Sequence, residues 1–360
     1  MPMPMSRPTP EVAITRIVAA PLLGESPKGG WSHEIRPEDS VHTLIAVHTS
    51  AGITGFGSVF TNGGLVQAGL RVLEPLFLGE NALEPERVTE TLHQNTFWMG
   101  RGGTLTHVIS GIDIALWDIL GKVLGQPVGR LLGGIHRTRV RPYCSLLMEE
   151  PDRMGEVILP FREAAGPDAD LLVDAGGSDA WWQPSLKWAI GAAHMLADYR
   201  AGWFEEALRP DALEDFIELR RQSPVPIAGG EVLTRRQAFT PFLVRGAFDI
   251  VQPDVTKVGG ISEQRRIAWM ADDFGVRYVG HGWNTALGVA ADLQLAAALP
   301  HVDYVEFIGG SPYVDGLLAE PFRLDADGCL EIPLRPGLGV ELDPEKVARY
   351  SPDAAALFAR

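Results

Sequence analysis

The sequence predicts an α/β protein: a modified (β/α) barrel of the TIM type, preceded by a smaller α+β domain. From about residue 140 onward, short apolar runs alternate with helical stretches. The runs end, in order, at Met148, Asp174, Glu205, Glu231, Asp254, His281 and Glu306. The ends recur every 23 to 31 residues, which is the length that a strand, a helix and two loops require. Because the period shows no reversal point, a closed barrel is favoured over a doubly wound sheet.

The first third of the chain has a different pattern. Residues 41–59 alternate apolar and polar side chains around glycine-bearing turns, which is typical of a β-hairpin. Residues 64–94 and 104–124 are expected to be helical, and Gly125 and Pro127 follow the second tract as helix stops do. We therefore expect an α+β domain over residues 1–135 and the barrel over residues 136–325.

One barrel unit is missing from this pattern. The sequence yields seven strands, whereas eight close the usual barrel. In residues 149–173 two helical stretches run together with no strand between them. Either the protein has lost one βα unit, or the printed sequence omits a segment.

Composition excludes several classes of function. The 360 residues carry a formal net charge of −15 with a pI near 5.0, so nucleic acid and anionic membranes are not expected partners. The chain has no apolar run of the roughly 20 residues that span a bilayer, and MPMPMSRPTP does not resemble a secretory signal. Cys144 and Cys329 are the only cysteines, which favours a cytoplasmic protein without a disulfide framework.

Acidic side chains end three consecutive predicted strands: Asp174, Glu205 and Glu231. In a barrel the carboxyl ends of the strands share one mouth, so these carboxylates should be neighbours. A single strand-end acid could equally cap the next helix, but three at matching positions favour a metal site. Clustered carboxylates cannot all ionise without a cation, and hard oxygen ligands from separate elements suit Mg²⁺.

The next strand ends add proton-transfer groups. Asp254 and His281 end successive strands, and a carboxylate beside a histidine orients the imidazole and raises its basicity. Glu306 ends the last strand and could donate or accept a proton. Mg²⁺ beside a general base can hold a substrate carboxylate and stabilise the enediolate that forms when the α-proton leaves.

These residues resemble those of the enolase superfamily, in particular its mandelate racemase-like subgroup. The matching motifs, in chain order, are SGIDIALWDILGKVLGQPVGRLLGG (110–134), LLVDAGG, WFEEAL, AGGE, QPDVTKVGG, GHGWNTALG and GCLEIPLRPGLGVELD (328–343). The resemblance implies that the N-terminal domain caps the barrel and that residues 326–360 return to it. It implies Mg²⁺ on Asp174, Glu205 and Glu231, an Asp254–His281 dyad, and Glu306 as an assisting acid.

The sequence also departs from that family. Most members carry a basic KxK or related motif on the second barrel strand, but no lysine lies between Lys122 and Lys187 here. The gap coincides with the missing strand, and because every other strand end is intact, an omitted segment is favoured over a true deletion. The family's usual DxN sequence is Asp174-Ala175-Gly176 here. Glu206 and Lys257 are expected to support the site rather than to act in it.

The resemblance favours a Mg²⁺-dependent dehydratase of a sugar acid, an aldonate or aldarate, with a small carboxylate as its partner molecule. A racemase, epimerase or cycloisomerase is the alternative, although racemisation normally needs the lysine as a second base. If the deletion is real, a catalytically inactive relative that binds metal or ligand is a third possibility, and a metal-dependent hydrolase barrel is more remote. Trp31, His33 and Arg101 are candidate substrate contacts, and a homo-oligomer is expected.

Overall fold

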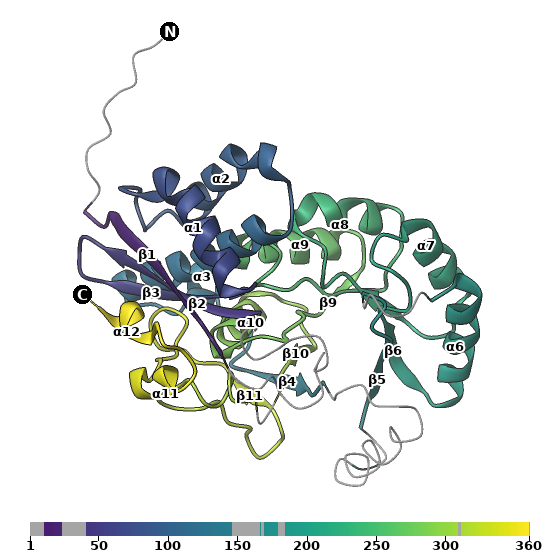
Figure 1. The fold of residues 1–360 in the computed structure, drawn as a ribbon. Coiled ribbons are helices and arrows are strands. Elements are labelled where there is room, and N and C mark those ends of the chain that lie inside the picture. The colour runs from purple at the N-terminus through teal and green to yellow at the C-terminus, as the bar shows by residue number, and fades with distance from the viewer. Residues whose placement is uncertain are drawn as a thin grey trace.

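A three-stranded antiparallel sheet forms the N-terminal end of the molecule (Figure 1). The computed structural model describes residues 11–23, 41–145, 166, 169–178, 184–308 and 311–359. The sheet has the order β1-β2-β3, with strands β1 (Ile14–Pro21), β2 (His42–Thr49) and β3 (Thr54–Phe60). The expected hairpin is the β2–β3 pair. β1, which was not predicted, pairs with the other edge of β2.

Helices cover one face of this sheet and bury a core of aliphatic side chains. They are α1 (Gly63–Phe77), α2 (Pro85–Asn95), the short 3₁₀ helix η2 (Phe97–Met99) and α3 (Thr104–Leu124). The tract 64–94, expected to be helical throughout, is two helices, because α1 ends before Gly79, whose φ of 78° lies in the left-handed region. At Gly57 a Cβ would lie 2.0 Å from the carbonyl oxygen of Gly111, so α3 and β3 pack closely only because this residue is glycine.

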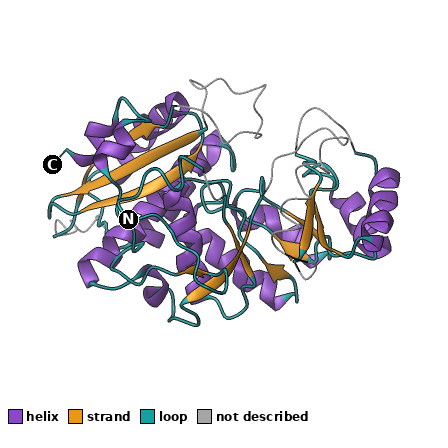
Figure 2. Cartoon of the chain, turned by 90° about the horizontal axis from the view of Figure 1, so that it is seen from below, coloured by secondary structure: helices purple, strands orange, loops and turns teal. Residues whose placement is uncertain are grey.

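Short parallel strands and their helices form the second part of the chain (Figure 2). The strands are β4 (Arg139–Tyr143), β5 (Leu171–Asp174), β6 (Ala201–Glu205), β7 (Ile227–Gly229), β8 (Ile250–Val251), β9 (Arg277–Tyr278) and β10 (Tyr304–Glu306). The helices are α4 (Val128–Leu131), α6 (Leu186–Asp198), α7 (Leu213–Gln222), α8 (Arg235–Val244), α9 (Gly260–Asp273) and α10 (Ala286–Ala298). α6 to α9 lie outside the strands β5 to β9, as a barrel requires (Figure 1).

The strand pairing runs most of the way round a ring. β5 to β9 pair in parallel and in order, a bridge between Gly280 and Val305 links the chain after β9 to β10, and β10 pairs in parallel with β4. Within the described residues no strand pairing joins β4 to β5. The tract between them, where a strand was missing from the sequence pattern, falls largely outside the described residues. The absence of one βα unit therefore remains a prediction.

The contact between the N-terminal helices and the barrel is made by buried polar side chains. Both oxygens of Asp113 on α3 accept hydrogen bonds from Ser262 in the first turn of α9, from its backbone N–H at 2.9 Å and from its hydroxyl. The indole of Trp117 donates to the Ser262 oxygen at 2.9 Å, and Ser110 accepts from the N–H of Gly259 at 2.8 Å. Burial raises the pKa of Asp113 to about 7. This contact fixes α3 against the start of the barrel helix α9.

The C-terminal segment returns to the N-terminal sheet. β11 (Leu330–Glu331) pairs with β4 in antiparallel fashion. α11 (Pro344–Ala348) and α12 (Ala354–Phe358) follow, and α12 packs against β1 and β2 (Figure 1). The Arg16 guanidinium of β1 donates to the carbonyl of Ala359 at 2.8 Å. Among the described residues, no helix is both long enough and apolar enough to cross a bilayer.

Candidate active site

Three carboxylates from consecutive strands converge at one end of the barrel. Asp174 and Glu205 are the last residues of β5 and β6, and Glu231 follows β7 by two residues. One oxygen from each lies within 4.8 Å of the other two. Glu205 and Glu231 are buried, whereas Asp174 is exposed at the edge of the group. The structure thus brings together the three side chains that the sequence predicted to be neighbours.

The charges of this group are poorly balanced by the protein alone. Although Asp174 lies at the exposed edge of the group, its carboxyl group is largely desolvated, and this desolvation and the charge of Glu231 raise the pKa of Asp174 to about 7. Burial and the charges of Asp174 and Glu306 raise the pKa of Glu205 well above its usual range. Carboxylic acids with such pKa values hold their protons at neutral pH unless a cation replaces them. The oxygen-only donor set and its unbalanced charge fit a hard divalent ion.

Beside the carboxylates, Asp254 and His281 form a hydrogen-bonded pair. Nδ1 of His281 lies 2.8 Å from Oδ2 of Asp254, and Nε2 lies 3.0 Å from Oε2 of Glu231. Burial lowers the pKa of His281, but the charges of Glu231 and Glu306 and the bond to Asp254 raise it well above the ordinary value. The imidazole therefore faces Glu231, one of the three carboxylates, and its orientation is fixed by Asp254.

Asp254 is itself held from several sides. Its Oδ1 accepts from the N–H of Thr256 at 2.7 Å and from the Thr256 hydroxyl at 2.6 Å. Although burial raises its pKa, the charge of Lys257 and the bond to His281 bring that pKa far below the usual range. Asp254 is thus an anion with a fixed orientation, which is what an imidazole partner requires.

Lys257 places a buried positive charge between the carboxylates of Glu231 and Asp254. Its Nζ lies 3.4 Å from Glu231 and 3.5 Å from Asp254, and it sits 4.3 Å above the ring of Phe60 on β3. Burial lowers the pKa of Lys257, but the charges of Glu231 and Asp254 raise it above its ordinary value. The two carboxylates thus hold the ammonium group in place. Burial raises the pKa of Glu231, but the charges of His281 and Lys257 lower it further, to about 2.

Glu306 closes the site on the side of β10. Its carboxylate accepts from the hydroxyl of Tyr143 at 3.0 Å, from the hydroxyl of Ser145 and from the N–H of Gly282 at 2.5 Å. Its Oε2 lies 3.9 Å from Nε2 of His281. The predicted acid therefore stands beside the predicted base, fixed by three donors.

Two family models match the chain over successive ranges. Residues 36–133 match the mandelate racemase / muconate lactonizing enzyme N-terminal domain, and residues 134–347 match the enolase C-terminal domain-like model. The chain belongs to the mandelate racemase/muconate lactonizing enzyme family. Membership in this family of the enolase superfamily agrees with the predicted α/β fold, an N-terminal cap followed by a TIM-type barrel.

Characterised members of this family are similar to the chain over most of its length. The D-galactarolactone cycloisomerase of Agrobacterium fabrum is 31% identical, covering 89% of this chain and 93% of its own. The D-xylonate dehydratase of Haloferax volcanii is 30% identical over 88% of this chain and 86% of its own. A crystal structure of an enolase-superfamily member from Polaromonas sp. JS666 superposes with a TM-score of 0.82 and 29% identity, covering 94% of this chain and 97% of its own.

The structure does not test the remaining residues that the sequence predicted to contact the substrate. Trp31 and His33 lie outside the described residues, as does Met148, and β4 ends earlier, at Tyr143. Arg101 is exposed and stacks over the ring of Phe97 at 5.3 Å. Its role in substrate binding stays a prediction.

Sequence reasoning did not single out the aromatic side chains that contact the acids. Nε1 of Trp203 donates to Oε2 of Glu205 at 3.0 Å, and Tyr143 donates to Glu306. The signal for Trp203 was available, because residues two apart on a strand point to the same face. Glu206 was expected to support the site, and it accepts from the Ser178 hydroxyl at 2.6 Å, with its backbone at a φ of 43°.

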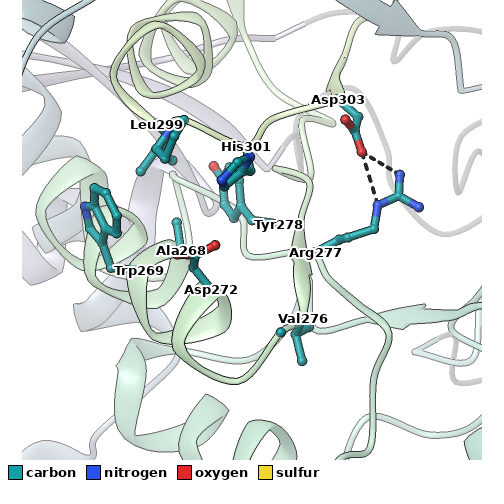
Figure 3. A pocket seen from close by; sticks show the side chains of 11 residues that line it. Ala268, Trp269, Asp272, Val276, Arg277, Tyr278, Leu299, His301 and Asp303 are labelled. Carbon is teal, nitrogen blue, oxygen red and sulfur yellow. Dashed lines mark hydrogen bonds and ion pairs between the residues drawn. The ribbon is translucent and has the colours of Figure 1, made fainter. Parts of the chain in front are cut away.

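A cavity of about 350 Å³ lies at the other end of the barrel (Figure 3). Arg277, which begins β9, and Asp303, which precedes β10, face each other across its rim and form an ion pair of 2.7 Å. At the opposite ends of the same strands, His281 follows β9 and Glu306 is the last residue of β10. In barrels of this type, sites lie at the carboxyl ends of the strands, so this cavity is separate from the candidate active site.

Proposed function

We propose that this chain is a Mg²⁺-dependent dehydratase of sugar acids, which removes the α-proton of an aldonate or aldarate and then its β-hydroxyl. The observation that carries the proposal is the convergence of three carboxylate oxygens within 4.8 Å, next to a histidine held by a buried aspartate. Family relatives named as dehydratases of D-xylonate and D-gluconate support the choice of reaction and substrate class.

The side chains of the candidate active site have separate roles in this reaction. Asp174, Glu205 and Glu231 would hold Mg²⁺, which when bound neutralises the substrate carboxylate and stabilises the enediolate charge. Nε2 of His281 takes the α-proton, and Asp254 stabilises the imidazolium that results. The same imidazolium returns the proton to the departing β-hydroxyl, so that water leaves and an enol remains. That enol tautomerises to a 2-keto-3-deoxy acid.

Neutralising Glu231 prepares His281 for this role. The charge of Glu231 is the largest of the causes that raise the pKa of His281. When a cation offsets that charge, the imidazole is less strongly protonated and can act as a base near neutral pH. Glu306, 3.9 Å from Nε2, is placed to hydrogen-bond the substrate oxygen nearest the base.

A library of aldonic and aldaric acids tests the proposal. With Mg²⁺ present, at least one acid should yield a 2-keto-3-deoxy product, with kcat/KM above about 10³ M⁻¹s⁻¹, and chelation should abolish turnover. A library without any turned-over acid, assayed with Mg²⁺ bound, would count against dehydration.

Cycloisomerisation is the second candidate, since a D-galactarolactone cycloisomerase is among the similar proteins. That reaction can use the same metal and base. Solvent deuterium incorporated at the α-carbon without loss of water from the substrate would favour it, or racemisation, over dehydration.

We also infer that the printed sequence lacks one βα unit between β4 and β5 because a segment is omitted, rather than because the protein has lost it. The alignment with the cycloisomerase runs over 367 positions while it covers only 89% of the 360 residues here, so the relative has residues without a counterpart. The intact mass of the purified protein should therefore exceed the 39.1 kDa of the printed sequence by a few kDa. A mass of 39.1 kDa would mean instead that the protein has lost the unit.

A further inference from the structure

Three aromatic rings lie together inside the barrel, next to the acidic side chains. Tyr143 of β4, Trp203 of β6 and Tyr304 of β10 contact each other edge to face. The centroid distances are 5.3 Å between Tyr143 and Trp203, 5.9 Å between Trp203 and Tyr304, and 6.4 Å between Tyr143 and Tyr304. Their apolar neighbours Leu172, Ala228, Ile250 and Val279 come from β5, β7, β8 and the chain after β9. We call Tyr143, Trp203 and Tyr304 the aromatic cluster.

The strand geometry links this cluster to the acids next to it. Trp203 precedes Glu205 by two residues on β6, and Tyr304 precedes Glu306 by two residues on β10. Alternate residues on a strand point to the same face, so ring and acid occupy successive layers of the barrel interior. Tyr143 is level with Glu306 in the register of the β4–β10 pair.

Within the part of the chain that the structure describes, the indole N–H of Trp203 donates to Glu205. It donates to Oε2 of Glu205 at 3.0 Å, and the side chains are 1% and 5% exposed. Tryptophan can only donate, and a buried donor left without an acceptor is unfavourable, so this hydrogen bond is retained. Since the rings of the aromatic cluster fix the indole, the indole in turn fixes the orientation of the Glu205 carboxylate.

We propose that Trp203 is a positioning residue that holds Glu205 in the orientation required for binding a divalent cation. The inference rests on the proposed function only in taking Glu205 as a ligand of Mg²⁺. Hydrogen-bond partners of metal ligands commonly contribute 10- to 100-fold to metal affinity. Trp203 is such a hydrogen-bond partner of Glu205, and its contacts with Tyr143 and Tyr304 hold the indole in place.

Trp203→Phe tests the proposal, because it keeps an aromatic ring and removes the N–H donor. Calorimetric titration with Mg²⁺ should give a Kd that is about 10- to 100-fold higher than that of the unaltered protein. The matched control is Trp188→Phe on α6, because Trp188 is 43% exposed and packs on Phe204, the neighbour of Glu205, with a centroid distance of 6.0 Å. Its Kd for Mg²⁺ should stay within about twofold of the original.

If Trp203→Phe fails to fold, benzothienylalanine at position 203 replaces the N–H with sulfur in a ring of nearly the same size. A higher Kd in this variant, with an unchanged melting temperature in chelator, supports the positioning role. An unchanged Kd in a folded variant overturns it, while the proposed function stands. If the unaltered protein binds no Mg²⁺ at all, the proposed function fails first, because the ligand assignment of Glu205 is then wrong.

Discussion

Replacing His281 with asparagine should reduce kcat by about 10³- to 10⁴-fold and leave the Kd for Mg²⁺ within a few-fold of the original value. Asparagine keeps a polar side chain of similar reach but cannot take or return a proton. Asp174, Glu205 and Glu231, whose oxygens lie within 4.8 Å of one another, are unchanged in this variant. The measurements are the rate of 2-keto-3-deoxy acid formation on the best substrate and calorimetric titration with Mg²⁺.

His301→Asn is the matched control for this experiment. His301 is exposed and lines the cavity at the opposite end of the barrel (Figure 3), so its replacement should leave kcat unchanged. Asp254→Asn should lower kcat as well, because the hydrogen bond of 2.8 Å to Nδ1 of His281 would lose its charge. If His281→Asn kept a tenth or more of the original activity, His281 would not be the base, and Lys257 or Glu306 would become the candidate.

The strand ends could be predicted from sequence because acids avoid the apolar interior except where a site requires them. Asp174, Glu205 and Glu306 are the last residues of β5, β6 and β10. Asp254 and His281 instead follow their strands by three residues, because β8 and β9 are only two residues long. The apolar runs around them are longer than the strands, since the connecting segments are buried too. The order of the side chains was therefore predictable, while the lengths of the strands were not.

The supporting contacts were harder to predict, because they depend on which side chains meet across the barrel. Lys257 reaches both Glu231 and Asp254 and also the ring of Phe60, which lies almost 200 residues earlier in the chain. No local pattern encodes such a contact. Tyr143 reaches Glu306 because β4, the first barrel strand, pairs with β10, the last. Pairing between the first and last strands of a barrel follows from the closed fold, so that contact could have been inferred.

The ion-free protein should lose stability as the pH rises from about 5.5 to about 8.5. Burial, together with the charges of Glu231 and Asp174, raises the pKa of Glu206 to about 8, and Asp174 has a pKa of about 7. In the unfolded chain such groups titrate near pH 4. Between these values the folded state binds more protons than the unfolded state, so the free energy of unfolding falls with rising pH. His281, whose pKa is raised in the folded protein, acts in the same direction.

The size of this effect is set mainly by the buried acids. Because Asp174 is exposed, solvent screens part of its share. We expect the buried Glu206 to account for a loss of roughly 2–4 kcal/mol across the window, and Glu205 acts in the same direction. Glu231 and Asp254 have lowered pKa values, and their contribution is lost only in more acidic solution. The slope of the unfolding free energy against pH, between about 5.5 and 8.5, therefore reports the protonation of the clustered carboxylates.

Mg²⁺ should cancel this loss of stability with rising pH, which is the second large effect. Metal binding requires ionised ligands and therefore displaces protons from Asp174 and Glu205, so its stabilisation grows with pH. Melting temperatures in chelator should fall with rising pH, while those in saturating Mg²⁺ stay nearly constant, so that the difference reaches several degrees at the alkaline end.

Two variants serve as controls. Glu206→Gln should flatten the dependence of the melting temperature on pH in chelator without abolishing the response to Mg²⁺. Glu214→Gln, at an exposed ion pair with Arg245 on the barrel surface, should change neither. A melting temperature in chelator that rises with pH across this window would mean that the carboxylates are already ionised and balanced by the protein, and the argument for a divalent ion from their charge would fail.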